Sequence, residues 1–150
     1  MNYEPAMRAA IERARFAATA SSDVPVGAVM LNEKGEIISL GANQRELLRD
    51  PVGHAEIVAI RSAARSLGTW RLDNCTLVVT LEPCAMCAGA IMQTRIPRVV
   101  FGAWDSKAGA AGSTCDLLRD PRALHKVEVI SDVLKDKCAA LLKEFFSEQR

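Results

Sequence analysis

Hydrophobic and polar positions along the chain predict alternating helices and strands. Apolar residues recur at helical spacing over residues 4–20, which predicts an amphipathic helix. Two segments rich in β-branched residues, 24–31 and 36–40, flank a short turn with a glycine and favour an antiparallel hairpin. Further helices are expected at residues 55–67, at 85–94, and in a last segment that Ser131 or Asp132 caps and that runs to about residue 147. Further apolar strands are expected at residues 76–81, 98–101 and 127–130.

The order of these elements predicts an α/β fold. Strands separated by helices of this length need crossover connections and therefore pair in parallel. The continuous apolar run at residues 76–81 is typical of a strand that is covered on both faces. We therefore expect a three-layer α/β/α sandwich with a mixed five-stranded sheet. The length of 150 residues, of which 49% are apolar, is typical of a single domain that spans residues 1–150.

Charge and hydropathy limit the classes of partner. The formal net charge is +1, so no strong overall field indicates nucleic acid or a membrane, and a polyanion would need a local basic patch. Glu4 and Glu12 interrupt the N-terminal segment, which therefore does not resemble a signal peptide. No run approaches the roughly 20 apolar residues of a membrane span. We expect a soluble, cytoplasmic protein with no membrane partner.

The cysteines fall into two groups. Their number is five, which is odd, and the chain is not a small secreted scaffold, so a disulfide framework is not expected. Cys75, Cys115 and Cys138 are expected to be small buried apolar residues. Cys84 and Cys87 lie three positions apart, directly after a predicted strand, and need a different explanation.

The pair formed by Cys84 and Cys87 predicts a zinc site. The end of a central strand lies at the edge of the sheet where α/β folds bind ligands. Pro83 and the following helix start place both thiols on one side of the first turn, where free backbone N–H groups favour thiolates. His54, which also precedes a helix, is the nearest third ligand. Two thiolates and one imidazole leave the fourth position for water, as in catalytic zinc sites.

Glu56 is the predicted proton-transfer group beside this metal. It lies two residues after His54, roughly 200° around an ideal helix, so both reach one site only at the irregular helix start. There the backbone N–H of Ala55 also points inward. A carboxylate beside zinc-bound water accepts its proton and passes it on. The alternative is an acid that only stabilises the first turn of the helix.

The H-x-E…P-C-x-x-C arrangement resembles the signature of zinc deaminases. The segments "VPVGAV", "HAEIVAI", "TLEPCAMCAGA", "RIPRVVFGA" and "CAALLKEFF" closely resemble the bacterial tRNA-specific adenosine deaminases, over nearly the whole chain. This resemblance implies a homodimer of the cytidine-deaminase fold with one zinc per subunit, bound by His54, Cys84 and Cys87. It also implies a tRNA anticodon stem-loop as partner, with the wobble adenosine converted to inosine.

The same resemblance implies roles for residues around the base. Glu56 would protonate the ring and then the leaving amine, and the amide of Ala55 would help to hold the base. Asn43 matches the asparagine that hydrogen-bonds the purine, and its amide both donates and accepts. Val26 and Gly27 would line the pocket, with Gly27 allowing the backbone to approach a flat base.

The loop "WDSKAG" corresponds to a segment that borders the RNA groove in the family. Lys107 would meet a phosphate, and Asp105 would accept a hydrogen bond from a ribose. Further candidates for phosphate contacts, each of which we expect to be a solvated surface charge instead, are Arg45, Arg95, Arg98 and Lys143. Phe145 and Phe146 would either stack on a base or pack the last helix, and we expect packing for at least one of them.

The chain departs from the family pattern at four positions, Gln44, Val52, Gly53 and Leu124. None is a predicted metal ligand or acid–base group, so the departures concern RNA contacts and the choice of tRNA. Two other functions fit the same zinc motif. One is a deaminase of a free base or nucleoside, of the guanine or cytidine type. The other is a non-catalytic RNA-binding partner, which the presence of Glu56 disfavours.

Overall fold

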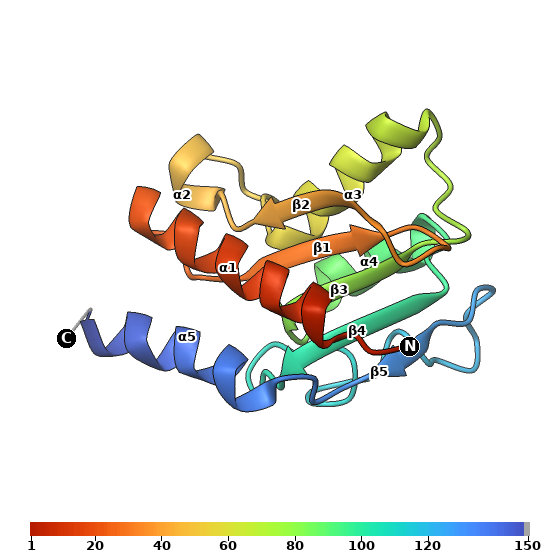
Figure 1. Cartoon of the computed structure of the whole chain (residues 1–150). Coiled ribbons are helices and arrows are strands. Elements are labelled where there is room, and N and C mark those ends of the chain that lie inside the picture. Colours follow the sequence, from red (N-terminus) through yellow and green to blue (C-terminus); the bar gives the residue numbers. More distant parts are fainter. Residues whose placement is uncertain (149–150) are drawn as a thin grey trace.

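A computed structural model describes residues 1–148 and contains one mixed sheet with helices packed on both of its faces (Figure 1). In chain order, the elements are α1 (Glu4–Ala20), β1 (Gly27–Leu31), β2 (Ile37–Ala42), α2 (Arg45–Leu48), α3 (Ala55–Leu67), β3 (Thr76–Leu81), α4 (Ala85–Gln93), β4 (Arg98–Ala103), β5 (Glu128–Ile130) and α5 (Lys135–Glu148). The predicted α/β sandwich with a mixed five-stranded sheet is confirmed.

The sheet has the strand order β2-β1-β3-β4-β5. β1 pairs antiparallel with both β2 and β3, whereas β4 pairs in parallel with β3 and with β5. The predicted hairpin is therefore one edge of the sheet. The helix α4 is the crossover between the parallel strands β3 and β4, whereas a segment without a helix joins β4 to β5. Because β3 lies in the middle, its carboxyl end reaches the centre of the sheet edge, where β1 and β4 flank it.

Two apolar layers cover the sheet, and the alternation of side chains along the strands assigns them. Ala28 and Met30 of β1 face the layer built by α3 and α4, whereas Val29 and Leu31 face the layer built by α1 and α5. All residues of β1 are buried, as expected for a strand covered on both faces. The helices α3 and α4, which begin at the metal donors, therefore lie in the same layer on one face of the sheet.

Three local predictions need correction. The short helix α2 was not predicted, because four residues are too few to show a helical period. Neither Ser131 nor Asp132 caps the last helix, which begins at Lys135 because Asp132 and Leu134 both adopt positive φ. Cys115 is exposed, whereas Cys75 and Cys138 are buried as predicted, and all five cysteines are free.

Among residues 1–148, no helix has both the length and the apolar composition needed to cross a membrane.

Candidate active site

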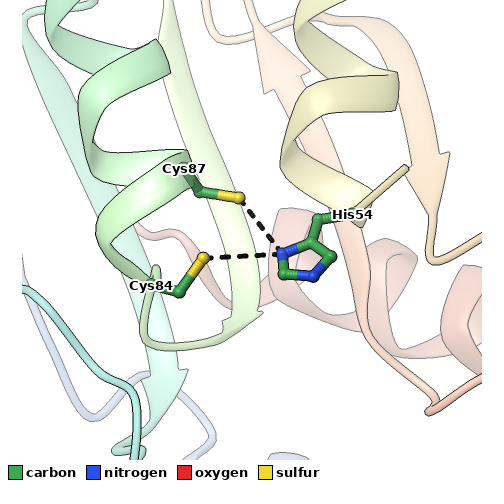
Figure 2. A group of neighbouring side chains, drawn as sticks. All are labelled: His54, Cys84 and Cys87. Atoms are coloured by element: carbon green, nitrogen blue, oxygen red, sulfur yellow. Dashed lines mark hydrogen bonds between the residues drawn. The ribbon is translucent and has the colours of Figure 1, made fainter. Parts of the chain in front are cut away.

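Three predicted metal ligands meet where two helices begin. His54 directly precedes α3, Cys84 directly precedes α4, and Cys87 lies in the first turn of α4. Figure 2 shows His54 Nδ1 facing both sulfur atoms. The distance from this nitrogen to each sulfur is 3.5 Å. All three donor atoms lie within 4.8 Å of one another. The sheet therefore brings together side chains that are 30 and 33 residues apart in sequence.

The spacing of the donors fits zinc. Bond lengths of about 2.05 Å to nitrogen and about 2.3 Å to sulfur, at a tetrahedral angle, separate the two atoms by about 3.6 Å. The observed separations of 3.5 Å agree with this value. Three donors leave one tetrahedral position for water or substrate, as in catalytic zinc sites.

The electrostatics of the two sulfurs also suit a cation. Hydrogen bonds from Cys87 and His54 lower the pKa of Cys84 to about 3. The hydrogen bond to Cys84, together with burial, raises the pKa of Cys87 above its ordinary value. The donors by themselves therefore favour one thiolate, and a divalent cation supplies the charge that ionises the second thiol as well.

Glu56 is a buried acid rather than a surface acid at a helix start. Its side chain is only 4% exposed, in the first turn of α3, and its burial raises its pKa to about 7. A residue that only stabilises the helix dipole remains in water, where its charge costs little. Burial beside a metal site instead suits a group that takes up and releases protons near neutral pH.

A cavity of about 180 Å³ opens at these residues. Its wall contains Val24, Val26, Asn43, Arg45, His54, Ala55, Glu56, Leu81, Glu82, Cys84, Asp105 and Ala108. The structure thus brings together most of the predicted site residues. Larger grooves of about 600 and 430 Å³ lie elsewhere on the described residues, but neither contains the metal donors.

Gly27 and Lys107 lie outside this cavity wall. A Cβ on Gly27 would overlap the carbonyl of Ala10 in α1, so the glycine allows a helix, and not a base, to approach the strand. Lys107 is exposed on the cavity rim, and its backbone N–H donates to Asp105 Oδ1 at 3.1 Å. Its contact with phosphate therefore stays a prediction about an exposed side chain.

The other basic candidates divide by position. Arg45 is exposed and lies in the cavity wall. Arg98 begins β4, at the opposite end of the parallel strands from the metal donors, and its guanidinium binds Glu128 at 2.7 Å. Arg95 precedes the same strand and donates to the carbonyl of Met92. Arg98 and Arg95 therefore lie away from the cavity, as expected of surface charges.

The two aromatic residues on α5, Phe145 and Phe146, differ in their exposure to solvent. Phe145 is half-buried and lines the groove between α1 and α5, whereas Phe146 is 52% exposed. Their rings meet edge to face, with centroids 5.3 Å apart. Phe145 is thus the better placed of the two for packing, and the expectation that at least one of them packs the last helix stays a prediction.

Sequence reasoning missed two buried acids that shape the cavity rim. Asp23 is 3% exposed and accepts hydrogen bonds from the backbone N–H groups of Glu46 at 2.7 Å and Leu47 at 3.1 Å, which holds α2 in place. Glu82 is 2% exposed and accepts from the loop after β4. The sequence did contain a signal for Glu82, because this residue directly follows a continuous apolar strand and is therefore expected to be buried. A buried carboxylate needs hydrogen-bond donors from elsewhere in the chain.

Comparison with known proteins also indicates a zinc site at these residues. Residues 1–103 match the cytidine and deoxycytidylate deaminase zinc-binding region, a segment that contains the three metal donors and Glu56. The chain is 46% identical to the tRNA-specific adenosine deaminase of Bacillus subtilis (strain 168), over 144 residues that cover 96% of this chain and 88% of that protein.

Two solved structures place the fold. One, from a study of A-to-I editing by tRNA:A34 deaminases, superposes with a TM-score of 0.87 at 39% identity and covers 91% of this chain and 98% of that chain. The guanine deaminase from Nitrosomonas europaea superposes with a TM-score of 0.80 at 28% identity and covers 96% of this chain and 84% of that chain. The chain therefore has the fold of enzymes that deaminate nucleobases, and it contains the zinc-binding region of a deaminase family.

Proposed function

This chain belongs to the zinc-dependent cytidine and deoxycytidylate deaminase family, and we propose that it hydrolyses the wobble adenosine of a tRNA anticodon to inosine. In this reaction, water replaces the amino group at C6 of adenine, and ammonia leaves. The identity of 46% to a tRNA-specific adenosine deaminase over nearly the whole chain supports this substrate. Zinc is the cofactor that the matching region and the three donors indicate.

The observation that carries the proposal is one cavity wall that unites metal donors, a buried acid and a base-binding amide. His54 and Cys84 lie in this wall beside Glu56 and Asn43. Cys87 is fully buried behind it. A non-catalytic RNA-binding protein would not need a buried carboxylate beside a metal site, since that carboxyl group costs free energy to desolvate.

The residues divide the chemistry between them. His54, Cys84 and Cys87 would hold the zinc, which would supply a Lewis acid that lowers the pKa of water towards neutrality. Glu56 accepts the proton of that water, then delivers protons to the ring nitrogen and to the departing amine. The backbone N–H of Ala55 and the amide of Asn43 would hold the purine in the cavity beside Glu56. Val26 contributes an apolar wall against the flat base.

Basic and acidic groups on the cavity rim would bind the RNA backbone. Arg45 and Lys107 lie at or beside the cavity mouth and would meet phosphates there. Asp105 lies in the cavity wall, and its Oδ1 already accepts from the N–H groups of Lys107 and Ala108. Its second oxygen would accept the ribose 2′-OH that distinguishes RNA from DNA.

We further propose that the chain acts as a single deaminase domain in a cytoplasmic homodimer with one zinc per subunit. Sedimentation equilibrium of the zinc-loaded protein tests the dimer, because a mass near 16.2 kDa at micromolar concentration would contradict it. Metal analysis of the same sample tests the stoichiometry.

The function is tested with total tRNA from a bacterium that lacks its own wobble deaminase activity. After incubation, sequencing reveals inosine as an adenosine that is read as guanosine, and we expect this change only at the wobble position. Protein with Glu56→Ala is the control, since it keeps the metal donors. No change in any tRNA would contradict the proposal.

A second candidate function is deamination of free guanine, which the TM-score of 0.80 to a guanine deaminase favours. The two are separated by ammonia release from free guanine, guanosine, cytidine and adenosine, compared with an anticodon stem-loop at equal concentration. We expect turnover of the stem-loop alone. Turnover of guanine without turnover of the stem-loop would favour the second function.

A further inference from the structure

Glu82 is a buried carboxylate whose hydrogen-bond donors all come from one loop. It directly follows β3 and is 2% exposed. Its Oε1 accepts from the backbone N–H of Asp105 at 3.0 Å and from the hydroxyl of Ser113. Its Oε2 accepts from the backbone N–H groups of Ala111 at 2.9 Å and Ser113 at 3.0 Å. These donors lie 23 to 31 residues further along the chain, in a segment that we name the rim loop, residues 105–113.

The rim loop connects the cavity with the segment that carries a metal ligand. Asp105 and Ala108 of the loop lie in the cavity wall. The backbone N–H of Ala110 donates to the carbonyl of Pro83 at 2.7 Å, and Gly109 forms a β-bridge with Cys84. Residues 82–84 therefore each contact the rim loop and hold it in place. Cys84, the last of these three residues, carries a sulfur of the metal site.

Gly109 shows how closely the loop fits this carboxylate. A Cβ at that position would overlap the Glu82 carboxyl group, so only glycine lets the loop backbone pass there. The carboxylate thus has backbone against it on one side and four donors around its oxygens. A shorter or displaced side chain at residue 82 would leave these donors without their acceptor, which costs most for the buried N–H group of Ala111.

Glu82 lies in the cavity wall, but it has no remaining capacity to bind substrate. An ionised carboxylate offers about four acceptor sites, and four donors of the loop occupy them. Its influence on the reaction must therefore pass through the loop. The loop residues that face the cavity, Asp105 and Ala108, are the ones that Glu82 can place.

We propose that Glu82 is a positioning residue that sets the substrate-facing side of the rim loop relative to the metal ligand Cys84. RNA binding, rather than metal binding, then depends on its carboxylate. This inference rests on the proposed function, because it assigns the loop to the RNA side of the same cavity. It makes the carboxylate the link between the part of the site that recognises substrate and the part that activates water.

The test variant is Glu82→Gln, which keeps the shape and replaces one acceptor oxygen by an NH₂ group. An NH₂ group at Oε2 would face two backbone N–H groups. At Oε1 it would face the N–H of Asp105 and the hydroxyl of Ser113, which can turn to accept. The second orientation leaves only Asp105 without an acceptor, so the variant should loosen the loop at its substrate-facing end.

Three measurements on zinc-loaded protein follow from this geometry. Amide exchange at Asp105, measured by NMR without RNA, should become about tenfold faster, as expected for the loss of one hydrogen bond. KM for an RNA anticodon stem-loop should rise about tenfold for the same reason, while kcat stays within about threefold. The zinc content should remain one per chain. A purely structural role would lower the melting temperature without this separation of KM from kcat.

Two further variants serve as control and second test. Ser113→Ala removes one side-chain donor but keeps all three backbone donors, so exchange at Asp105 and KM should change by less than about threefold. Gly109→Ala places a methyl group in the space of the Glu82 carboxyl group, and it should reproduce the rise in KM with zinc retained. This variant tests the proposal if Glu82→Gln does not fold.

The proposal is overturned if exchange at Asp105 and KM are both unchanged in Glu82→Gln. It is also overturned if zinc is lost and kcat falls at constant KM, because Glu82 would then support only the metal ligand. Absence of turnover by the unaltered protein would contradict the proposed function instead. The exchange experiment contains no RNA, so it tests the hold of Glu82 on the loop in either case.

Discussion

The metal donors and the cavity rim differ in the interactions that hold them in place. Cys87 is fully buried in the first turn of α4, and Ala88 beside it belongs to the apolar core. The rim consists of the loop after β4 and the short helix α2, and each rests on one buried acid. Glu82 accepts from the loop, whereas Asp23 accepts from the start of α2. Packing thus holds Cys87 of the metal site, and carboxylates that accept backbone N–H groups hold the parts that face the substrate.

This difference predicts that the two regions fail separately. A helix start that belongs to a close-packed core is stabilised by many small contacts, so its geometry survives changes at the rim. A loop that rests on a few hydrogen bonds loses about 1 kcal/mol of stabilisation with each of them. Rim variants should therefore change substrate binding at constant metal content, and donor variants should change both.

Cys84→Ala should have the largest effect. It removes a metal ligand, so we expect loss of zinc, loss of detectable deamination and a lower melting temperature, because metal binding contributes to folding. Elemental analysis, tRNA sequencing and thermal unfolding measure the three effects. Cys115→Ala is the matched control, since Cys115 is exposed and distant from the donors in sequence. Full retention of zinc by Cys84→Ala would disprove its assignment as a ligand.

Glu56→Ala should abolish most catalysis without disturbing the centre. We expect one zinc per chain and unchanged RNA affinity, with kcat lowered by about 10²–10⁴-fold, the usual contribution of a general acid–base group. Single-turnover rates and RNA binding by fluorescence anisotropy separate the two effects. Glu4→Ala is the control, because Glu4 is an exposed acid in the first turn of α1. A near-normal kcat would mean that another group transfers the protons.

Asp23→Ala should affect only the other side of the rim. Removal of the acceptor for two N–H groups of α2 should cost about 1 kcal/mol of unfolding free energy, up to about 2 kcal/mol, as for other helix caps. KM for the stem-loop should rise, because Arg45 begins this helix, while zinc content stays constant. Ser21→Ala, which removes one hydroxyl donor to the same carboxylate, is the milder control. Loss of zinc in Asp23→Ala would contradict the separation of rim and centre.

Asp105→Asn should have the smallest effect, confined to the choice between RNA and DNA. Asparagine keeps the Oδ1 acceptor for Lys107 and Ala108, so the loop stays folded. Removal of the charge should lower kcat/KM on RNA a few-fold and ease the repulsion of a DNA backbone. Matched RNA and DNA hairpins with one target adenosine measure the ratio, and Asp73→Asn at an exposed site is the control. An unchanged ratio would make Asp105 an ordinary loop acid.

Much of this fold was predictable because its signals are local. The predicted helices at residues 4–20 and 55–67 have the observed bounds, and α4 ends one residue earlier than predicted. Apolar periodicity marks these elements because a helix or strand must bury one face. The helix α2 could not be predicted in this way, because four residues are too few to show a helical period. It is held instead by hydrogen bonds to Asp23, which lies 23 residues before Glu46.

The metal centre was also predictable from short spacings. Two cysteines three positions apart, after a strand, share one helix start, and a histidine before another helix completes the set. The grouping of His54, Cys84 and Cys87 in space agrees with that expectation. Gly27 shows the limit of the same method: it occurs within a matching motif, but its missing side chain faces α1 and not the cavity.

The sequence by itself predicted the elements, the pair formed by Cys84 and Cys87, and the acid two residues after His54, because each of these depends on residues within a few positions of one another. Only the tertiary structure decided that Glu82 holds the rim loop and that Arg98 lies away from the cavity. Those facts depend on which strands become neighbours and on which ends of parallel strands meet. The hydrogen bonds of Glu82 join residues 23 to 31 positions apart, and unlike the metal donors their partners are mostly backbone N–H groups, which every loop residue carries, so no residue type in the sequence marks them.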